Sequence, residues 1–443
     1  MFATTARSDR AELSAWVLDA RSRTLALVSD LSDEQWMGPR LSIVNPIRWE
    51  LGHLAWFAEH WVLRHAAGSV PLREDADTLF DSSTVPHDVR WDLPLPDRAA
   101  TLRYLEDVRD RVLARIDEAT FSTRDAYFVR LAVFHEDMHD EAFAYTRQTL
   151  GYPSPIGIGR RIKVPSADRT NLGDARVPGG VFRVGAERPT PGVPDPFVFD
   201  NEKWSHDVEV APFSIARAAV SQGQFAAFVE DGGYRREELW TDDGRAWRTR
   251  AGADGPAYWR RDGDSWLRRD FDRWVPLEPD RAVVHVNAHE ADAYCRWAGR
   301  RLPTEAEWEA AASGEPASGG DRLAPHRRRF PWGDSPPSEA HACLDGHGDG
   351  CADVASHPAG DSAFGCRQMW GNVWQWTSTP FAPYPGFVAD PYKEYSLPWF
   401  HTHRVLRGGC QWTRTRLLRN TWRNFYTPDR RDVWAGFRTC ALG

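Results

Sequence analysis

The chain has 443 residues, of which 42% are hydrophobic and 27% are charged, and its formal net charge is -8 at pH 7. This length allows two or three domains, and the composition is ordinary for a globular protein. The acidic balance, with no basic run beyond the arginines at 327–329, excludes nucleic acid as the main partner. No segment approaches the roughly 18 apolar residues that cross a bilayer, and the chain does not open on an apolar signal core. We therefore expect a cytoplasmic protein with no membrane partner.

Residues 1–150 carry apolar side chains at helical spacing. The pattern repeats in four segments, near 16–31, 51–62, 98–116 and 125–149. Ser32 and Gln35 form a capping box that starts a further helix or turn. Between the second and third segments, residues 75–97 read as a polar loop. Four such segments predict a four-helix bundle, a scaffold that builds metal sites from facing helices.

Three histidines of this region form a candidate metal site. His135 and His139 are four residues apart and share one helix face, and His53 lies among apolar residues of the second segment. A three-histidine site leaves coordination positions open for substrate, water or O2. From spacing alone, zinc fits this set as well as iron does. Nearby acids either orient the imidazoles or form a solvated helix face; they are Glu136, Asp137 and Asp140.

The pattern changes after residue 150. Residues 151–174 are rich in Gly and Pro and read as a linker. Residues 175–443 contain short predicted strands (181–184, 208–210, 213–216 and 405–407), long loops and most of the 22 tryptophans. Thr304 and Glu307 form a capping box that starts one clear helix. The sequence thus predicts an α+β multidomain protein, with a helical bundle at 1–150 and a loop-rich mixed domain at 175–443.

All six cysteines lie in the C-terminal half, and none forms a CxxC pair. In a reducing compartment we expect them to be free thiols. Cys343 and Cys351 lie in a loop rich in Gly and Asp, where binding a metal or pairing with each other are both open alternatives.

Several runs of the C-terminal part resemble the formylglycine-generating-enzyme domain. The longest is RRLPTEAEWE at 300–309, and the others include PGGVF at 178–182, GNVWQWT at 371–377, VLRGG at 405–409 and AGFR at 435–438. The resemblance implies a C-type-lectin-like fold for residues 175–443. Formylglycine-generating enzymes use two cysteines after the Arg-Gly-Gly turn, but Thr413 and Leu418 hold the aligned positions here. We therefore expect that activity to be absent.

The N-terminal part resembles DinB-like four-helix bundles that carry a three-histidine metal set. The two parts together resemble the ergothioneine-type sulfoxide synthases, a family of mononuclear nonheme iron(II) enzymes. Its members use O2 to join a thiol sulfur to the imidazole C2 of hercynine, the trimethylated betaine of histidine. A related group, the selenoneine synthases, joins a selenosugar to hercynine. The resemblance implies Fe(II) at His53, His135 and His139, O2 as co-substrate, and small molecules as partners.

The resemblance also implies roles for residues of the C-terminal domain. Tyr384 aligns with the family's catalytic tyrosine, and Tyr392 and Tyr426 are alternatives. Asn424 aligns with a substrate-binding asparagine. The quaternary ammonium of hercynine has no hydrogen-bond donor, so aromatic faces suit it. The candidate faces are Trp422, Phe425 and Tyr426.

The donor-binding positions depart from those of mycobacterial-type members, which hold γ-glutamylcysteine with two arginines and an aspartate. His87 stands at the first arginine position, Arg90 keeps the second, and Tyr426 stands at the aspartate position. Met138 replaces a glutamine before the last histidine. Without the full clamp for a zwitterionic dipeptide, we expect a donor other than γ-glutamylcysteine. A thiol is preferred, and a selenosugar is the alternative.

Two hypotheses from other classes stay open. A zinc-dependent hydrolase or thiol transferase would use the same bundle and consume no O2. A lectin-like binding protein would carry a structural metal, and a structural site is normally closed by four ligands. No convincing fourth ligand is visible, because His60 and His65 lie at the far end of the second segment.

Overall fold

The structure of the protein is a computed structural model that describes residues 7–158, 167–170, 172–189 and 197–443. The chain divides into two compact units, Met1–Ile158 and Gly159–Gly443. The division falls within the predicted linker 151–174, of which residues 159–166 and 171 lie outside the described residues. The assignment of a linker therefore stays a prediction.

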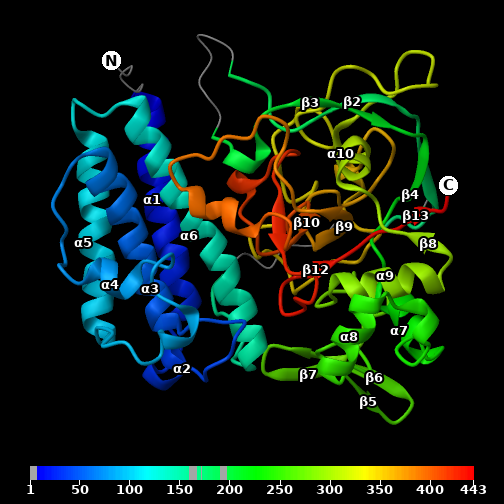
Figure 1. Ribbon diagram of the computed structural model, residues 1–443, viewed down its shortest axis with the longest axis horizontal. Helices are drawn as coiled ribbons and strands as arrows, with labels where there is room; N and C mark the ends of the chain where they lie inside the picture. Colours follow the sequence, from blue (N-terminus) through cyan, green and yellow to red (C-terminus); the bar gives the residue numbers. More distant parts are fainter. Residues whose placement is uncertain (1–6, 159–166, 171, 190–196) are drawn as a thin grey trace. The chain divides into compact units, whose positions relative to one another are not determined.

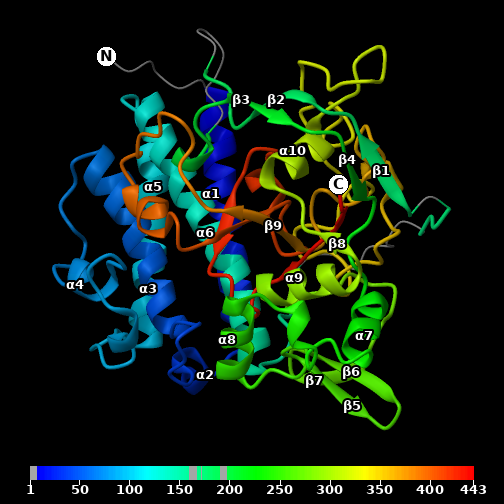
Figure 2. The same cartoon turned by 45° about the vertical axis from the view of Figure 1, so that its right-hand side comes forward.

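The first unit is a bundle of helices, as Figures 1 and 2 show from two directions. Its elements are α1 (Arg7–Val28), α2 (Asp33–Met37), α3 (Ile47–Ala58), η1 (Glu59–Ala66), α4 (Ala76–Phe80), η2 (His87–Val89), α5 (Arg98–Asp117) and α6 (Thr123–Leu150). The π-helical segment η1 continues α3 directly. α1 packs against α5 and α6, and α3 packs against the same two helices. The predicted four-helix bundle is confirmed.

Helix α6 is fixed at both ends by its sequence. At its start the Ser122 hydroxyl accepts from the Asp125 amide, and the Asp125 carboxylate accepts from the Ser122 amide, which is a capping box. At its end Gly151 takes a left-handed conformation with φ 65°, which lets its amide reach the carbonyls of the last turn. These caps set the register in which the histidines of α6 face the bundle interior.

The predicted polar loop 75–97 contains a helix that the sequence reading missed. In α4, Ala76, Leu79 and Phe80 lie at helical spacing and are buried, and α4 packs against α3. The segment is short and flanked by acids, so its apolar side chains gave a weak periodic signal. Its position matters because Phe80 reaches the candidate site.

The second unit is a mixed domain with short elements. Its α-helices are α7 (Gln222–Glu230), α8 (Asp242–Ala251), α9 (Ala288–Trp297) and α10 (Glu305–Ser313). Its 3-10 helices are η3 (Asp200–Glu202), η4 (Glu237–Leu239), η5 (Pro358–Gly360), η6 (Lys393–Tyr395), η7 (Leu397–Trp399) and η8 (Thr415–Leu417). Its strands are β1 (Asp174–Val177), β2 (Gly180–Val184), β3 (His206–Val210), β4 (Phe213–Ala216), β5 (Trp259–Asp262), β6 (Ser265–Asp270), β7 (Arg273–Pro276), β8 (Arg300–Arg301), β9 (Trp374–Pro380), β10 (Arg404–Arg407), β11 (Asn424–Tyr426), β12 (Ala435–Gly436) and β13 (Cys440–Ala441).

These strands form small sheets that bring distant segments together. Two sheets have four strands each, in the orders β1-β4-β13-β8 and β11-β10-β9-β12, and the others are β2-β3 and β5-β6-β7. Val405 of β10 pairs with Phe425 of β11 in antiparallel register. The β9–β12 pairing is parallel, unlike the others. The predicted α+β fold class is confirmed.

The core of the second unit lies around α10. Trp308 is buried and its indole N–H donates to the Gln375 side chain at 2.8 Å. Next to it a buried charge network joins Glu305 and Glu309 of α10 to Arg407 at 2.7 and 2.8 Å. Burying charges is tolerated only when they are paired in this way. The motif at 300–309 therefore supplies buried packing and ion pairs to this core.

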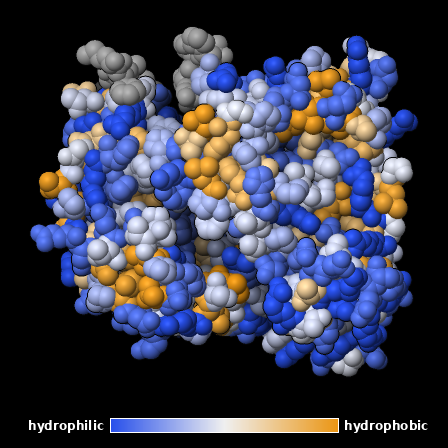
Figure 3. Space-filling view, viewed as in Figure 1, coloured by the Kyte–Doolittle hydropathy of each residue, from blue (hydrophilic) through white to orange (hydrophobic). Residues whose placement is uncertain are grey.

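Large exposed hydrophobic side chains are scattered over the surface. Figure 3 shows a mostly hydrophilic face with small separate apolar patches. Among the described residues, no helix is both long enough and apolar enough to cross a membrane.

Candidate metal centre

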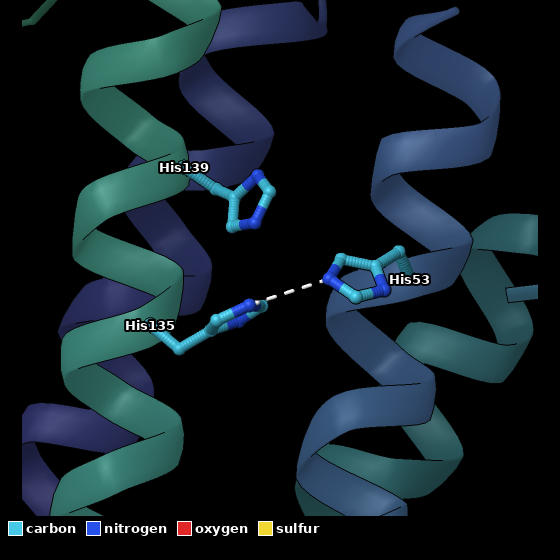
Figure 4. Close-up of side chains that lie close together, drawn as sticks. All are labelled: His53, His135 and His139. Carbon is cyan, nitrogen blue, oxygen red and sulfur yellow. Dashed lines mark hydrogen bonds between the residues drawn. The ribbon is translucent and has the colours of Figure 1, made fainter. Parts of the chain in front are cut away.

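Three histidines converge inside the helical unit. His53 extends from α3, and His135 and His139 extend from α6 toward it (Figure 4). One ring nitrogen of each lies within 4.8 Å of the other two. Among the described residues this is the one group of three or more His, Cys, Asp or Glu side chains that could hold a metal ion. The structure thus brings together the residues that the sequence singled out.

The tautomer of His53 is set by a backbone group. Its Nδ1 lies 2.7 Å from the carbonyl oxygen of Phe80. A carbonyl only accepts, so Nδ1 carries the proton and donates. The lone pair of neutral His53 is then on Nε2, which lies 3.3 Å from Nε2 of His135. Two nitrogens bound to one metal ion at about 2.1 Å lie about 3.0–3.4 Å apart, so this spacing fits a shared ligand role.

The other two rings are held by different devices. His139 places Nδ1 at 2.5 Å from a carboxylate oxygen of Glu50, which is buried in α3. The ring of His135 stacks on Phe57, with centroids 3.6 Å apart and planes 4° apart. A hydrogen-bonded carboxylate or carbonyl behind a metal-binding histidine fixes its ring and its tautomer. The arrangement therefore fits a metal ion.

Burial keeps two of these rings neutral. It lowers the pKa of His53 and of His135 well below the ordinary histidine range, and the charge of His139 lowers both pKa values further. Both rings are consequently neutral near pH 7, and a neutral imidazole is the form that binds a metal.

The acids that follow His135 do not take the roles that the sequence left open. Glu136 accepts from Arg21 of α1 at 2.7 Å, and both Glu136 and Asp140 accept from the Thr24 hydroxyl at 2.8 Å. All these side chains are buried. Glu136 and Asp140 therefore neither orient the imidazoles nor form a solvated face, because they join α6 to α1. Asp137 is fully buried, so it does not belong to a solvated face either.

Of the predicted donor-binding residues of this unit, Arg90 is linked to the triad through Trp49, and Met138 is next to His139 in sequence. The Arg90 guanidinium lies 3.7 Å above the ring of Trp49, and Trp49 stacks on His53 with centroids 5.0 Å apart. Arg90 also donates to the Asn45 side chain at 2.7 Å, and burial lowers its pKa to about 10. His87 is half-buried, with Nε2 at 2.8 Å from the Val44 carbonyl. Met138 is half-buried and adjoins His139 in α6.

The predicted substrate-binding residues of the second unit lie in and beside β11. Trp422 is buried and its indole N–H donates to the Tyr395 hydroxyl at 3.3 Å. Phe425 stacks on Phe381 at 4.0 Å, and its ring also lies 5.7 Å from that of Tyr395. Asn424, Phe425 and Tyr426 are half-buried. The structure thus joins Trp422 and Phe425 into one aromatic cluster through Tyr395, a residue that the sequence reading did not single out.

The predicted catalytic tyrosine belongs to the core of the second unit. Tyr384 is buried, its hydroxyl donates to Glu305 at 3.3 Å, and the Arg423 guanidinium lies 4.0 Å from its ring. Burial raises the pKa of Tyr384 far above its ordinary value. Tyr392, one of the alternatives, is half-buried, with its ring 6.1 Å from that of Tyr395. The catalytic assignment stays a prediction.

Known proteins share this architecture. Residues 162–441 match the sulfatase-modifying factor enzyme 1-like domain, and residues 18–143 match the DinB superfamily. Over 438 residues the chain is 37% identical to the hercynine oxygenase of Mycolicibacterium thermoresistibile, which covers 97% of this chain and 94% of that protein. It is 35% identical over 430 residues to the hercynine oxygenase of Mycobacterium tuberculosis, with 96% and 98% covered. The chain belongs to the hercynine oxygenase family.

The membership confirms the resemblance drawn from the sequence motifs, and the two domain matches confirm the DinB-like and formylglycine-generating-enzyme-like assignments. The second unit is also similar to the formylglycine-generating enzyme of Streptomyces coelicolor, at 32% identity over 305 residues, with 62% of this chain and 90% of that enzyme covered. Thr413 and Leu418 are buried here beside Gly409, whose added Cβ would lie 3.4 and 2.8 Å from them. This family member therefore has no thiol at either aligned position.

The six cysteines of this hercynine oxygenase family member are all buried, and none forms a disulfide, as the sequence predicts. Burial raises the pKa of Cys343 and of Cys351 to about 12, so both stay protonated. A thiol binds metal as thiolate, and neither residue belongs to the metal-capable group found among the described residues. Of the two open alternatives for this pair, pairing is not formed and metal binding has no support.

The sequence reading missed two groups at the centre, Glu50 and the Phe80 carbonyl. A signal for Glu50 was present, because an acid three residues before His53 in an otherwise apolar helix needs a buried partner. The Phe80 carbonyl had no signal, since any residue supplies one.

Proposed function

We propose that this protein is an iron(II)- and O2-dependent oxidoreductase that joins a sulfur or selenium donor to the imidazole C2 of hercynine, as in ergothioneine or selenoneine biosynthesis. The observation that carries the proposal is the convergence of His53, His135 and His139 with two of their rings oriented from behind. The similarity to hercynine oxygenases over nearly the whole chain supports the substrate.

His53, His135 and His139 would hold the iron. Iron(II), when bound, would supply the one-electron chemistry that activates O2 and the open positions that a soft donor prefers. The chain's own contribution at this centre is to keep His53 and His135 neutral by burial and to fix the direction of each ring. A prearranged ligand set avoids the cost of reorganising groups during the reaction.

With a thiol donor, the proposed reaction consumes hercynine, the thiol and one O2. The C2–H bond of the imidazole and the S–H bond of the donor break, and a C–S bond forms. One oxygen atom of O2 stays on sulfur as a sulfoxide, and the other leaves with the two hydrogens as water. O2 is the oxidant, so no further co-reactant is required.

The aromatic cluster around β11 supports recognition of the hercynine cation. Trp422 and Phe425 present large rings to this cluster, and a quaternary ammonium is bound through aromatic faces. Asn424, beside them in β11, offers an amide to the polar atoms of the substrate. Tyr426 extends the same strand, and the Arg430 guanidinium lies 5.3 Å from its ring.

The contacts of Arg90 support a donor other than γ-glutamylcysteine. Two of its nitrogens already donate to Asn45 and to the Val85 carbonyl, and its plane covers Trp49. His87 is directed to the Val44 carbonyl, so Arg90 is the one guanidinium at these two positions and the two-arginine clamp is incomplete. A smaller thiol such as cysteine is the preferred donor, and a selenosugar is the alternative.

The sequence resemblance favours Tyr384 as the catalytic tyrosine, but the contacts of the candidate tyrosines differ. The hydroxyl of Tyr384 is engaged by Glu305 in the core, whereas Tyr392 lies beside the aromatic cluster through Tyr395. We therefore propose Tyr392 as the proton or electron donor, with Tyr384 and Tyr426 as alternatives.

Anaerobic loading with Fe(II), followed by O2-electrode measurements, tests the proposal. We expect one iron per chain and O2 consumption that requires both hercynine and a donor. His135→Ala should abolish both iron binding and O2 consumption. Tight zinc binding with no O2 consumption by the iron-loaded protein would favour the hydrolase or transferase hypothesis instead.

A further inference from the structure

The Glu50 carboxylate accepts a hydrogen bond from His139, a histidine of the triad. The Glu50 side chain is 2% exposed, and its Oε1 lies 2.5 Å from Nδ1 of His139. It stands three residues before His53 in α3, so one helix provides a ligand and also holds the ligand provided by α6. No lysine or arginine forms an ion pair with it within the described part of the chain.

A buried carboxylate is costly unless a positive charge is near. Glu136 and Glu59, two other buried carboxylates of the bundle, accept hydrogen bonds from arginine, hydroxyl or amide donors. Glu136 has Arg21, and Glu59 has the Tyr104 hydroxyl and the Leu72 amide. For Glu50 the direct partner is an imidazole. The charge of the buried Arg90 guanidinium also acts on Glu50, and a cation bound on the far side of the imidazole would add a second positive charge to this hydrogen-bonded pair.

We infer that Glu50 is a positioning residue of the metal centre: it holds the His139 ring through Nδ1–H and adds negative charge to that ligand. This inference rests on the proposed metal role of the triad. His53 is held by a neutral carbonyl and His135 by ring stacking, so the three ligands are not equivalent. The ligand backed by the carboxylate becomes the strongest electron donor of the set.

The charge and the hydrogen bond of Glu50 can be separated by substitution. Glu50→Gln keeps an oxygen acceptor of the same length and removes the charge, and Glu50→Ala removes both. Glu59→Gln is the matched control, because Glu59 is another buried carboxylate of the continuous α3–η1 segment. Within the described residues its hydrogen bonds are with Tyr104 and Leu72, away from the triad.

The test measures the dissociation constant for Co(II) alone, by competition with a chromogenic chelator, on the full-length protein. We expect Glu50→Gln to weaken binding about 10- to 100-fold and Glu50→Ala at least as much, as for other groups behind metal ligands. The visible absorption bands of bound Co(II) should shift in Glu50→Gln. Glu59→Gln should keep the wild-type constant and spectrum even where its melting temperature falls.

The outcomes separate this inference from the proposed function. If the wild-type protein binds Co(II) and Glu50→Gln has the same dissociation constant and spectrum, the role of Glu50 is overturned and the metal site remains. Equal losses in Glu50→Gln and Glu59→Gln would also overturn it, since the effect would then follow stability. Failure of the wild-type protein to bind any metal would instead refute the proposed function.

Discussion

The ring of Phe80 packs directly on the backbone of Gly52, where an added Cβ would lie 2.2 Å from a ring carbon. Real Cβ atoms essentially never come so close, so only glycine fits here. The contact places the Phe80 carbonyl at 2.7 Å from His53, the residue after Gly52. A glycine inside a helix lowers stability by about 1 kcal/mol relative to alanine. At Gly52 this loss is offset by the Phe80 contact that orients His53, a proposed metal ligand.

Gly52→Ala is therefore expected to destabilise the protein, although alanine favours helices. The clash with Phe80 should outweigh the propensity gain and lower the free energy of unfolding by about 1–3 kcal/mol, as overpacking does. Chemical denaturation measures this change. The double variant Gly52→Ala/Phe80→Leu should recover part of the loss, because leucine vacates the ring position. A Gly52→Ala protein more stable than wild type would contradict the packing described.

The buried ring of His285 predicts acid sensitivity of the second unit. Burial lowers the pKa of His285 to about 3, and its Nδ1–H donates to the Asp432 carbonyl. An unfolded histidine titrates near pH ~6.5, so below this pH the unfolded chain binds a proton that the folded chain refuses. The free energy of unfolding therefore keeps its full contribution from neutral His285 above pH ~6.5. As pH falls from ~6.5 toward 3, this contribution decreases by up to about 1.4 kcal/mol per pH unit.

His285→Asn should consequently have a shallower loss of stability between pH 6 and pH 4 in urea unfolding experiments. The matched control is His401→Asn, because His401 is exposed and both histidines have positive φ, 62° and 66°, which asparagine tolerates. The control should follow the wild-type pH profile. Identical profiles for all three proteins would show that His285 does not titrate in this way.

The two tyrosines are expected to respond differently to phenylalanine. Tyr384→Phe removes a hydrogen bond to Glu305 and should lower stability by about 1 kcal/mol, with turnover of the folded protein little changed. Tyr392→Phe should leave iron content unchanged and lower product formation of the folded protein at least tenfold. Unfolding curves and steady-state O2 consumption measure the two effects. The opposite pattern would return the catalytic role to Tyr384.

Much of the fold could be read from the sequence, because its signals are periodic or local. The helical spacing around His53 and the i, i+4 pair His135 and His139 predicted the bundle and the convergence of the triad. The capping boxes at Ser32 and Thr304 appear as predicted. Periodicity identifies a buried face and says nothing about the helix that covers it.

Because periodicity does not identify the covering helix, the sequence did not predict the partners of several buried side chains. Glu136 and Asp140 were expected either to orient the imidazoles or to form a solvated helix face. The helix that covers them is α1, whose Arg21 and Thr24 bind both acids instead. Glu50 reaches His139 across the bundle, a pairing between residues 89 apart in sequence that no local pattern encodes. In the second unit, strands as short as β11 gain their positions from pairing with β10, so their side-chain surroundings follow from tertiary contacts.

The most direct test of the proposed function is mass spectrometry of the product formed from hercynine deuterated at C2, with iron-loaded protein, O2 and either cysteine, γ-glutamylcysteine or a selenosugar. We predict an adduct of hercynine with the donor that has lost the C2 deuterium, formed with cysteine or the selenosugar in preference to γ-glutamylcysteine. Hercynine recovered with its deuterium intact in every reaction, from protein shown to hold iron, would contradict bond formation at C2.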